Sequence, residues 1–144
     1  MRLRFSRTTD YGLRAALEVA RVADGQLVTR HAIARATDAP ASVIAQPLAG
    51  LVRAGLLTGH TGPHGGYRLS RRACDISIYD VVLAVQGEKR DERCVLHEGV
   101  CLRQEACPFH AVLETAQQRY LDTLRATSLA DVLDAGPSAR PYGG

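Results

Sequence analysis

Two short amphipathic segments joined by a tight turn constrain this fold more than any other feature. Residues 30–36 and 41–54 both carry apolar side chains at helical spacing, and Asp38-Ala39-Pro40 lies between them. Thr29 is an N-cap candidate for the first segment, and Gly55 ends the second. The inward faces are expected to be Ala32, Ile33 and Ala36, then Val43, Ile44, Leu48, Leu51 and Val52.

A hairpin is expected directly after this helix pair. Its arms are residues 56–60 and 67–69, and its glycine-rich tip is residues 61–66. Two helices across a tight turn, followed by a hairpin, are typical of a winged helix-turn-helix.

The rest of the chain is expected to be helical, apart from one polar segment. Thr8, Thr9 or Asp10 is expected to cap a helix over residues 10–23, and Ser77 one over 78–85. A long helix is expected over 108–126 and a short one after Ser128. The apolar stripe of the long helix needs a partner; it comprises Val112, Leu113, Ala116, Tyr120, Leu121 and Leu124.

The predicted fold class is therefore mainly α with a small β-wing. Residues 1–87 are expected to form the winged helix-turn-helix domain and 88–107 a cysteine-rich loop. Residues 108–135 would supply a dimerisation helix and a closing helix, and 136–144 a disordered tail. There is no long apolar run and no secretory leader pattern, so we expect a cytoplasmic protein.

Charge is divided unevenly along the chain. Residues 1–72 carry eleven arginines and four acidic residues, a balance of +7, whereas residues 73–144 carry a balance of −4. A basic half predicts a polyanionic partner for that half, and the helix-turn-helix pattern identifies the partner as double-stranded DNA.

The second helix of the pair is expected to enter the major groove. Ser42 and Gln46 are candidates for base or phosphate contacts, and His64 for the minor groove. Pro47 lies inside this helix, where a kink or a local helix start is expected. The candidate phosphate contacts are Arg30, Arg35, Arg53 and Arg68.

Three cysteines, Cys94, Cys101 and Cys107, lie within 14 residues, separated by six and five residues. Zinc sites usually begin with two cysteines only two to four residues apart, so this spacing favours an iron–sulfur cluster. A cluster normally needs four protein ligands, and Asp10 and His110 are the candidates for the fourth. Cys74 is interpreted as a structural or incidental thiol.

Several motifs in order resemble the Rrf2 family of bacterial regulators. They are Thr9-Asp10-Tyr-Gly-Leu-Arg-Ala15, His64-Gly-Gly-Tyr-Arg-Leu69, Ile76-Ser-Ile-Tyr-Asp-Val-Val82, the three loop cysteines and Thr127-Ser-Leu-Ala-Asp-Val-Leu133. The resemblance covers roughly residues 1–134. It implies a homodimer whose long helices pair, a palindromic operator, and cluster ligation by Cys94, Cys101 and Cys107.

The resemblance leaves the fourth ligand open. IscR-like members use a histidine three residues after the last cysteine, which matches His110. Some NsrR-like members use an aspartate from the other subunit, which matches Asp10. The six-residue first gap is closer to the NsrR-like pattern. The expected regulator senses nitric oxide, redox state or iron, and we expect a repressor because repression is the commoner habit of this family. A [4Fe-4S] cluster is favoured over [2Fe-2S].

Three alternatives remain at the level of the sequence. One is a cluster-free thiol/disulfide switch, and another is a zinc-stabilised regulator. The third is a Cys–His enzyme, which the absence of any recognisable oxyanion or substrate motif disfavours.

Overall fold

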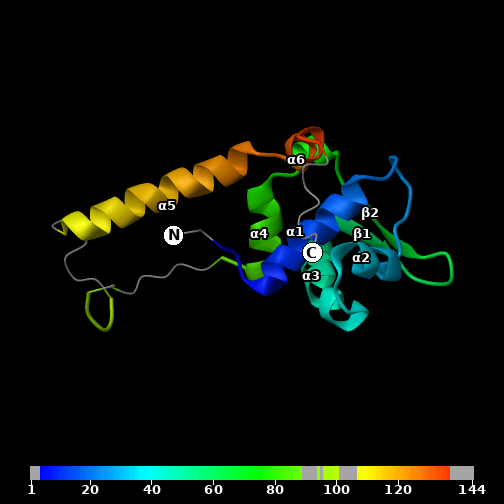
Figure 1. The fold of residues 1–144 in the computed structure, drawn as a ribbon, viewed down its shortest axis with the longest axis horizontal. Helices are drawn as coiled ribbons and strands as arrows, with labels where there is room; N and C mark the ends of the chain where they lie inside the picture. Colours follow the sequence, from blue (N-terminus) through cyan, green and yellow to red (C-terminus); the bar gives the residue numbers. More distant parts are fainter. Residues whose placement is uncertain (1–3, 89–93, 95, 101–106, 137–144) are drawn as a thin grey trace.

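A computed structural model describes residues 4–88, 94, 96–100 and 107–136. In these residues a compact winged-helix body carries one long helix that projects away from it (Figure 1). The cysteine-rich loop is therefore described only in part. Cys101 and residues 137–144 of the expected tail lie outside the described residues.

The first helix, α1 (Arg7–Ala20), begins and ends three residues earlier than predicted. The N-cap is Ser6, whose side chain accepts a hydrogen bond from the Thr9 backbone N–H, so the expected cap at Thr8, Thr9 or Asp10 is wrong. Thr9 lies inside the helix because its side chain is buried and bonded to the distant Gln86. A contact 77 residues away in sequence has no local signature.

The helix-turn-helix pair is α2 (Arg30–Thr37) and α3 (Ala41–Arg53). The cap at Thr29 is confirmed, and Asp38 makes the turn with a positive φ of 53°. Ala34 is buried and Ala36 is exposed, opposite to the predicted inward face. The predicted local start at Pro47 is wrong, since α3 runs unbroken through it.

Pro47 is tolerated because its ring is buried beside α1. An ideal Cβ on Gly12 would lie 3.4 Å from the Pro47 Cβ, so packing in the core offsets the hydrogen bond that proline cannot donate. The predicted apolar face of α3 is wrong at its edges. Val43 and Val52 are exposed, while Ile44, Leu48 and Leu51 are fully buried.

The wing consists of β1 (Leu57–His60) and β2 (Gly66–Leu69), paired antiparallel with Leu57 opposite Leu69. Val28 forms an isolated bridge to Tyr67, so the segment before α2 closes one side of the hairpin. Gly66 permits this approach, because a Cβ there would lie 2.7 Å from the Val28 carbonyl oxygen.

The chain then forms the 3₁₀ turn η1 (Ala73–Asp75), α4 (Ile78–Gln86), α5 (Pro108–Ala126) and α6 (Leu129–Asp134). Predicted caps at Ser77 and Ser128 are confirmed as complete capping boxes with Asp80 and Asp131. Ser77 and Ser128 also form an isolated bridge, which ties α6 to the start of α4.

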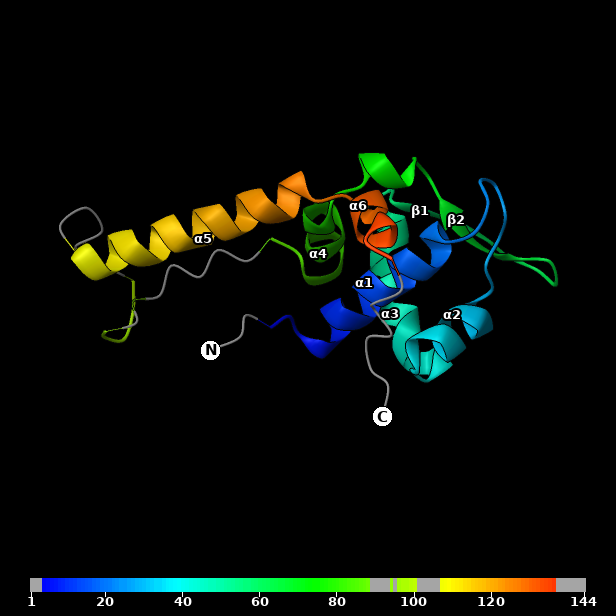
Figure 2. The same cartoon turned by 45° about the horizontal axis from the view of Figure 1, so that its top comes forward.

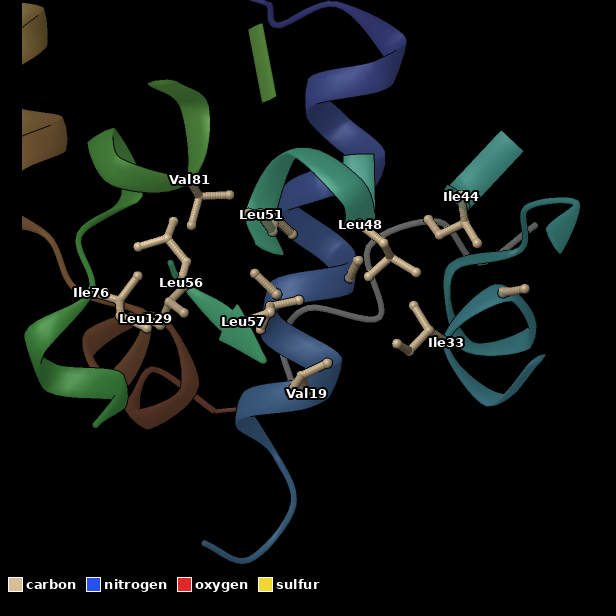
Figure 3. Close-up of a cluster of buried hydrophobic side chains, with 13 residues drawn as sticks. Val19, Ile33, Ile44, Leu48, Leu51, Leu56, Leu57, Ile76, Val81 and Leu129 are labelled. Atoms are coloured by element: carbon tan, nitrogen blue, oxygen red, sulfur yellow. The ribbon is translucent and has the colours of Figure 1, made fainter. Parts of the chain in front are cut away.

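The core lies where α1, α2, α3, α4, α6 and the wing meet (Figure 3). Leu129 of α6 is fully buried there beside Ile76 and Leu56, so the C-terminal end of the fold completes the winged-helix body (Figure 3). In contrast, no residue of α5 is buried, and the helix projects away from the body (Figure 2).

Gly50→Ala is expected to lower the melting temperature, although alanine favours a helix interior over glycine by about 1 kcal/mol. A Cβ on Gly50 would lie 2.8 Å from the backbone oxygen of Ala84, so α3 and α4 must separate. We expect about 1–3 kcal/mol of destabilisation in urea denaturation, as for an overpacked core. The exposed Ala49→Gly variant, which loses only helix propensity, is the control. A stabilised Gly50→Ala protein would contradict this close packing.

Candidate nucleic-acid interface and metal centre

One face of α3 is polar and exposed, and the opposite face is buried. Ser42, Gln46 and Arg53 recur at intervals of four and seven residues, so they follow one another along the helix surface, and all three are exposed. The buried face carries Ile44, Leu48 and Leu51. Packing therefore presents the predicted base-reading and phosphate-contacting residues to solvent.

Helix α2 adds cations beside this face. Arg30 and Arg35 are exposed on α2. A surface hollow at the α2–α3 turn is lined by His31, Arg35 and Asp38 together with residues 39–41. The sequence analysis did not identify His31 as a residue of this surface. Its position four residues before Arg35 could have indicated it, because residues four apart lie on one face of a helix.

The wing presents the other predicted contacts. His64 at the tip and Arg68 on β2 are exposed. Gly62 in the tip has a φ of 102°, a conformation that favours glycine. A second surface hollow is lined by Arg53 at the end of α3 and Arg71 after β2. All seven predicted DNA-contacting residues are thus accessible to a phosphate backbone.

Of the loop cysteines, Cys94 and Cys107 are described, and Cys107 lies at the end of α5 that is far from the winged-helix body (Figure 1). Cys94 opens a turn in which its backbone N–H donates to the Gly99 carbonyl over 2.8 Å. Residues 96–100 of this turn lie on the same side of the winged-helix body as the start of α5 in both views (Figures 1 and 2). Cys94 and Cys107 are half-buried free thiols.

Cys107 is the N-cap of α5, and its side chain makes no capping hydrogen bond. The partial positive charge of a helix N-terminus stabilises an anionic ligand beside it. His110 follows one turn later, with its Nε2 atom 4.0 Å from the Glu114 carboxylate.

Asp10 lies in the first turn of α1, away from these residues. The Phe5 ring, just before α1, is 6.3 Å from the Tyr120 ring of α5. Tyr120 is ten residues beyond His110, or about 15 Å at 1.5 Å per residue. The start of α1 therefore lies alongside the second half of α5, and the structure does not bring Asp10 and His110 of one chain together.

The donor types fit an iron–sulfur group, since Cys94 and Cys107 are free thiols and His110 follows Cys107 by one helical turn. Within residues 4–88, 94, 96–100 and 107–136, no three His, Cys, Asp or Glu side chains form a metal-binding group. A complete ligand set therefore needs Cys101, which is outside the described residues, or a second chain.

Known proteins resemble this chain over most of its length. The family model described as "Rrf2: Iron-dependent Transcriptional regulator" matches residues 5–135. Protein rrf2 of Nitratidesulfovibrio vulgaris is 28% identical over 123 residues, covering 85% of this chain and 82% of that protein. An HTH-type transcriptional regulator of Mycobacterium tuberculosis is 33% identical over 130 residues, covering 90% and 81%.

Solved structures show the same fold. IscR of T. potens has a TM-score of 0.74 and 25% identity, covering 98% of this chain and 94% of that one. CymR, the global cysteine regulator of B. subtilis, has a TM-score of 0.71 and 21% identity, covering 94% and 99%. No helix in the described part of the chain is long and apolar enough to cross a membrane. The chain belongs to the Rrf2 family and is a DNA-binding transcriptional regulator of the winged helix-turn-helix type, not an enzyme.

Proposed function

We propose that this protein is a dimeric repressor whose operator affinity depends on an iron–sulfur cluster. The observation that carries the proposal is the free thiol of Cys107 at the N-cap of α5, with His110 one turn on and a second free thiol, Cys94, at the start of a short turn earlier in the same loop. The expected ligands are Cys94, Cys101 and Cys107, with Asp10 or His110 as the fourth. When bound, a [4Fe-4S] or [2Fe-2S] cluster would supply sensitivity to nitric oxide, oxygen or iron supply.

The DNA-binding role assigns α3 to the major groove. Its exposed Ser42 and Gln46 would reach base edges, and Arg53, Arg30 and Arg35 would contact phosphates. The wing would place His64 near the minor groove and Arg68 against the backbone.

Dimerisation is supported by the unpartnered face of α5. Phe109, Val112 and Leu113 are 43%, 63% and 42% exposed, although they follow helical spacing. Large apolar side chains repeated along one face of a helix of about 28 Å call for a matching surface. A second copy of α5 supplies it by symmetry. Two recognition helices would then read a palindrome with half-sites about one helical turn apart.

The choice of fourth ligand decides how the two subunits are connected. His110 would complete a set within one chain, because it shares α5 with Cys107. Asp10 would have to come from the partner, since it lies far from the start of α5 in its own chain.

Anaerobic purification tests the cluster directly. The protein is expected to be coloured, with iron and acid-labile sulfide in comparable amounts, and to lose operator affinity when a chelator or nitric oxide removes its colour. A colourless protein that cannot be reconstituted would rule out the cluster. Zinc in its place would support the zinc-stabilised alternative. A metal-free protein with an oxidation-dependent disulfide would support the thiol switch, which the free Cys94 and Cys107 thiols permit.

Asp10→Ala and His110→Ala are expected to separate the two ligand sets. If Asp10 is the fourth ligand, Asp10→Ala loses iron and sulfide while His110→Ala keeps them. The reverse result would contradict the NsrR-like assignment and favour an IscR-like set. Glu18→Ala, a change of another carboxylate on α1, is the control and is expected to retain the cluster.

Arg53→Ala is expected to weaken binding to operator and non-operator DNA alike. Removing one phosphate contact reduces the slope of log K against log salt by about 1. The measurement is a salt titration of affinity by fluorescence anisotropy. Arg119→Ala on α5, an exposed arginine outside the winged helix, is the matched control. An unchanged slope for Arg53→Ala would remove Arg53 from the phosphate contacts.

A further inference from the structure

The last turn of α4 contacts both helices whose positions matter for the proposed function. Ala84 lies against the recognition helix α3, and Val85 lies against α1. The residue that ends α4, Gln86, is followed within two positions by the segment that carries the cysteines. The last turn of α4 is therefore directly connected in the chain to the cysteine segment, and it also packs against two helices of the DNA-binding domain.

Two glycines make these contacts close. A Cβ on Gly50 of α3 would lie 2.8 Å from the Ala84 carbonyl oxygen, and one on Gly12 of α1 would lie 2.5 Å from the Val85 Cγ2 atom. Gly50 thus lets α3 meet the backbone of α4, and Gly12 leaves room on α1 for the Val85 side chain. Closely packed helices cannot slide independently, so a displacement of this turn displaces its neighbours.

A hydrogen-bond chain links the same turn to the start of α1. The Thr9 hydroxyl donates to Gln86 Oε1 over 3.1 Å, and its oxygen lies 2.9 Å from the Ser6 hydroxyl. Thr9 is fully buried, whereas Gln86 is exposed. Asp10, one of the two candidate fourth ligands, is the next residue after Thr9.

The start of α4 is held by a separate set of contacts with the C-terminal end of α5 and with α6. The Ile78 N–H donates to the Thr127 carbonyl, and the Leu129 N–H donates to the Ile76 carbonyl. The Arg125 guanidinium lies 4.3 Å from the centroid of the Tyr79 ring. The start of α4 therefore contacts the C-terminal end of α5, and the end of α4 is followed in the chain by the cysteine segment.

We infer that Gln86 and Thr9 are positioning residues that couple the cysteine segment to α1 and, through the last turn of α4, to the recognition helix. This inference rests on the proposed function. When the cysteine segment is held in place, Gln86 holds the start of α1 and Ala84 holds α3 at Gly50. When the segment is released, the end of α4 loses its anchor, and both contacts relax together.

Gln86→Ala tests this coupling, with Gln118→Ala as the matched control, because Gln118 is an exposed glutamine that bonds only within α5. The readout is the ratio of operator affinities in the cluster-loaded and cluster-free forms. One hydrogen bond corresponds to a fold-change of about 2 to 10, so the Gln86→Ala ratio is expected to fall by that factor at unchanged iron content. Amide exchange in residues 7–12 is expected to rise, while Gln118→Ala matches the wild type.

Thr9→Val removes the same bond from the other side with little change of shape and is expected to reproduce the reduced ratio. If both variants keep the wild-type ratio of cluster-loaded to cluster-free operator affinity, the inference is overturned, whereas the proposed function is unaffected. Equal affinities of the wild-type protein with and without cluster overturn the proposed function, and the coupling falls with it because no signal remains to be transmitted.

Discussion

The double variant Val112→Lys/Leu113→Lys is expected to be monomeric and to lose at least about a hundredfold in operator affinity. Both side chains lie on the apolar stripe of α5 and are exposed in the single chain. Lysines there would place like charges opposite each other across a two-fold axis and forfeit the apolar contact. Joining two DNA-binding domains in one dimer raises the affinity for a two-half-site operator by about 10²–10⁴, and a monomer loses that gain.

The control for this variant is Ala111→Lys/Gln118→Lys. It adds the same two charges to exposed positions on the opposite side of α5. Light scattering and operator titration report on both proteins, and only the stripe variant is expected to dissociate. Circular dichroism should show both folded, since neither variant touches the buried core. A stripe variant that stays dimeric would exclude α5 as the dimer interface.

Cys107→Ser is expected to abolish cluster loading, with iron and sulfide per chain falling by at least about tenfold. Loss of a supporting group alone typically costs 10- to 100-fold in metal affinity, and a lost thiolate ligand removes more. Serine preserves the shape of the N-cap of α5, so helix stability should not fall. The measurements are iron and sulfide analysis and the visible spectrum after anaerobic reconstitution.

Cys74→Ser is the matched control for Cys107→Ser. Cys74 is an exposed free thiol in η1, in the segment between β2 and α4. Its replacement is expected to leave the cluster content and the operator affinity at wild-type values. If Cys107→Ser also retains full iron and sulfide, Cys107 is not a ligand, and the site must be rebuilt around other residues.

Local signals predicted most of the secondary structure. The expected long helix over residues 108–126 coincides with α5, and the caps at Thr29, Ser77 and Ser128 are those observed. Each cap depends on a side chain and a backbone N–H only three residues apart. Such contacts form wherever the sequence places them, so sequence spacing suffices to find them.

Errors arose where distant contacts override local preference. The start of α1 was placed too late because Thr9 is buried against Gln86 and does not cap the helix. The inward faces of α2 and α3 were misjudged at Ala36, Val43 and Val52, which are exposed. Apolar spacing marks a helix, but the directions from which neighbours approach decide how wide its buried face is.

The sequence by itself determined the winged-helix elements, the series of basic and polar residues that are exposed on α2, α3 and the wing, and the spacing that puts His110 one turn after the N-cap Cys107. All of these depend on residues within a few positions of one another. Only the tertiary structure decided that Asp10 lies far from the start of α5 and that the end of α4 touches both α1 and α3. Those relations join residues tens of positions apart, and packing of the core, with glycine at its closest points, brings them together.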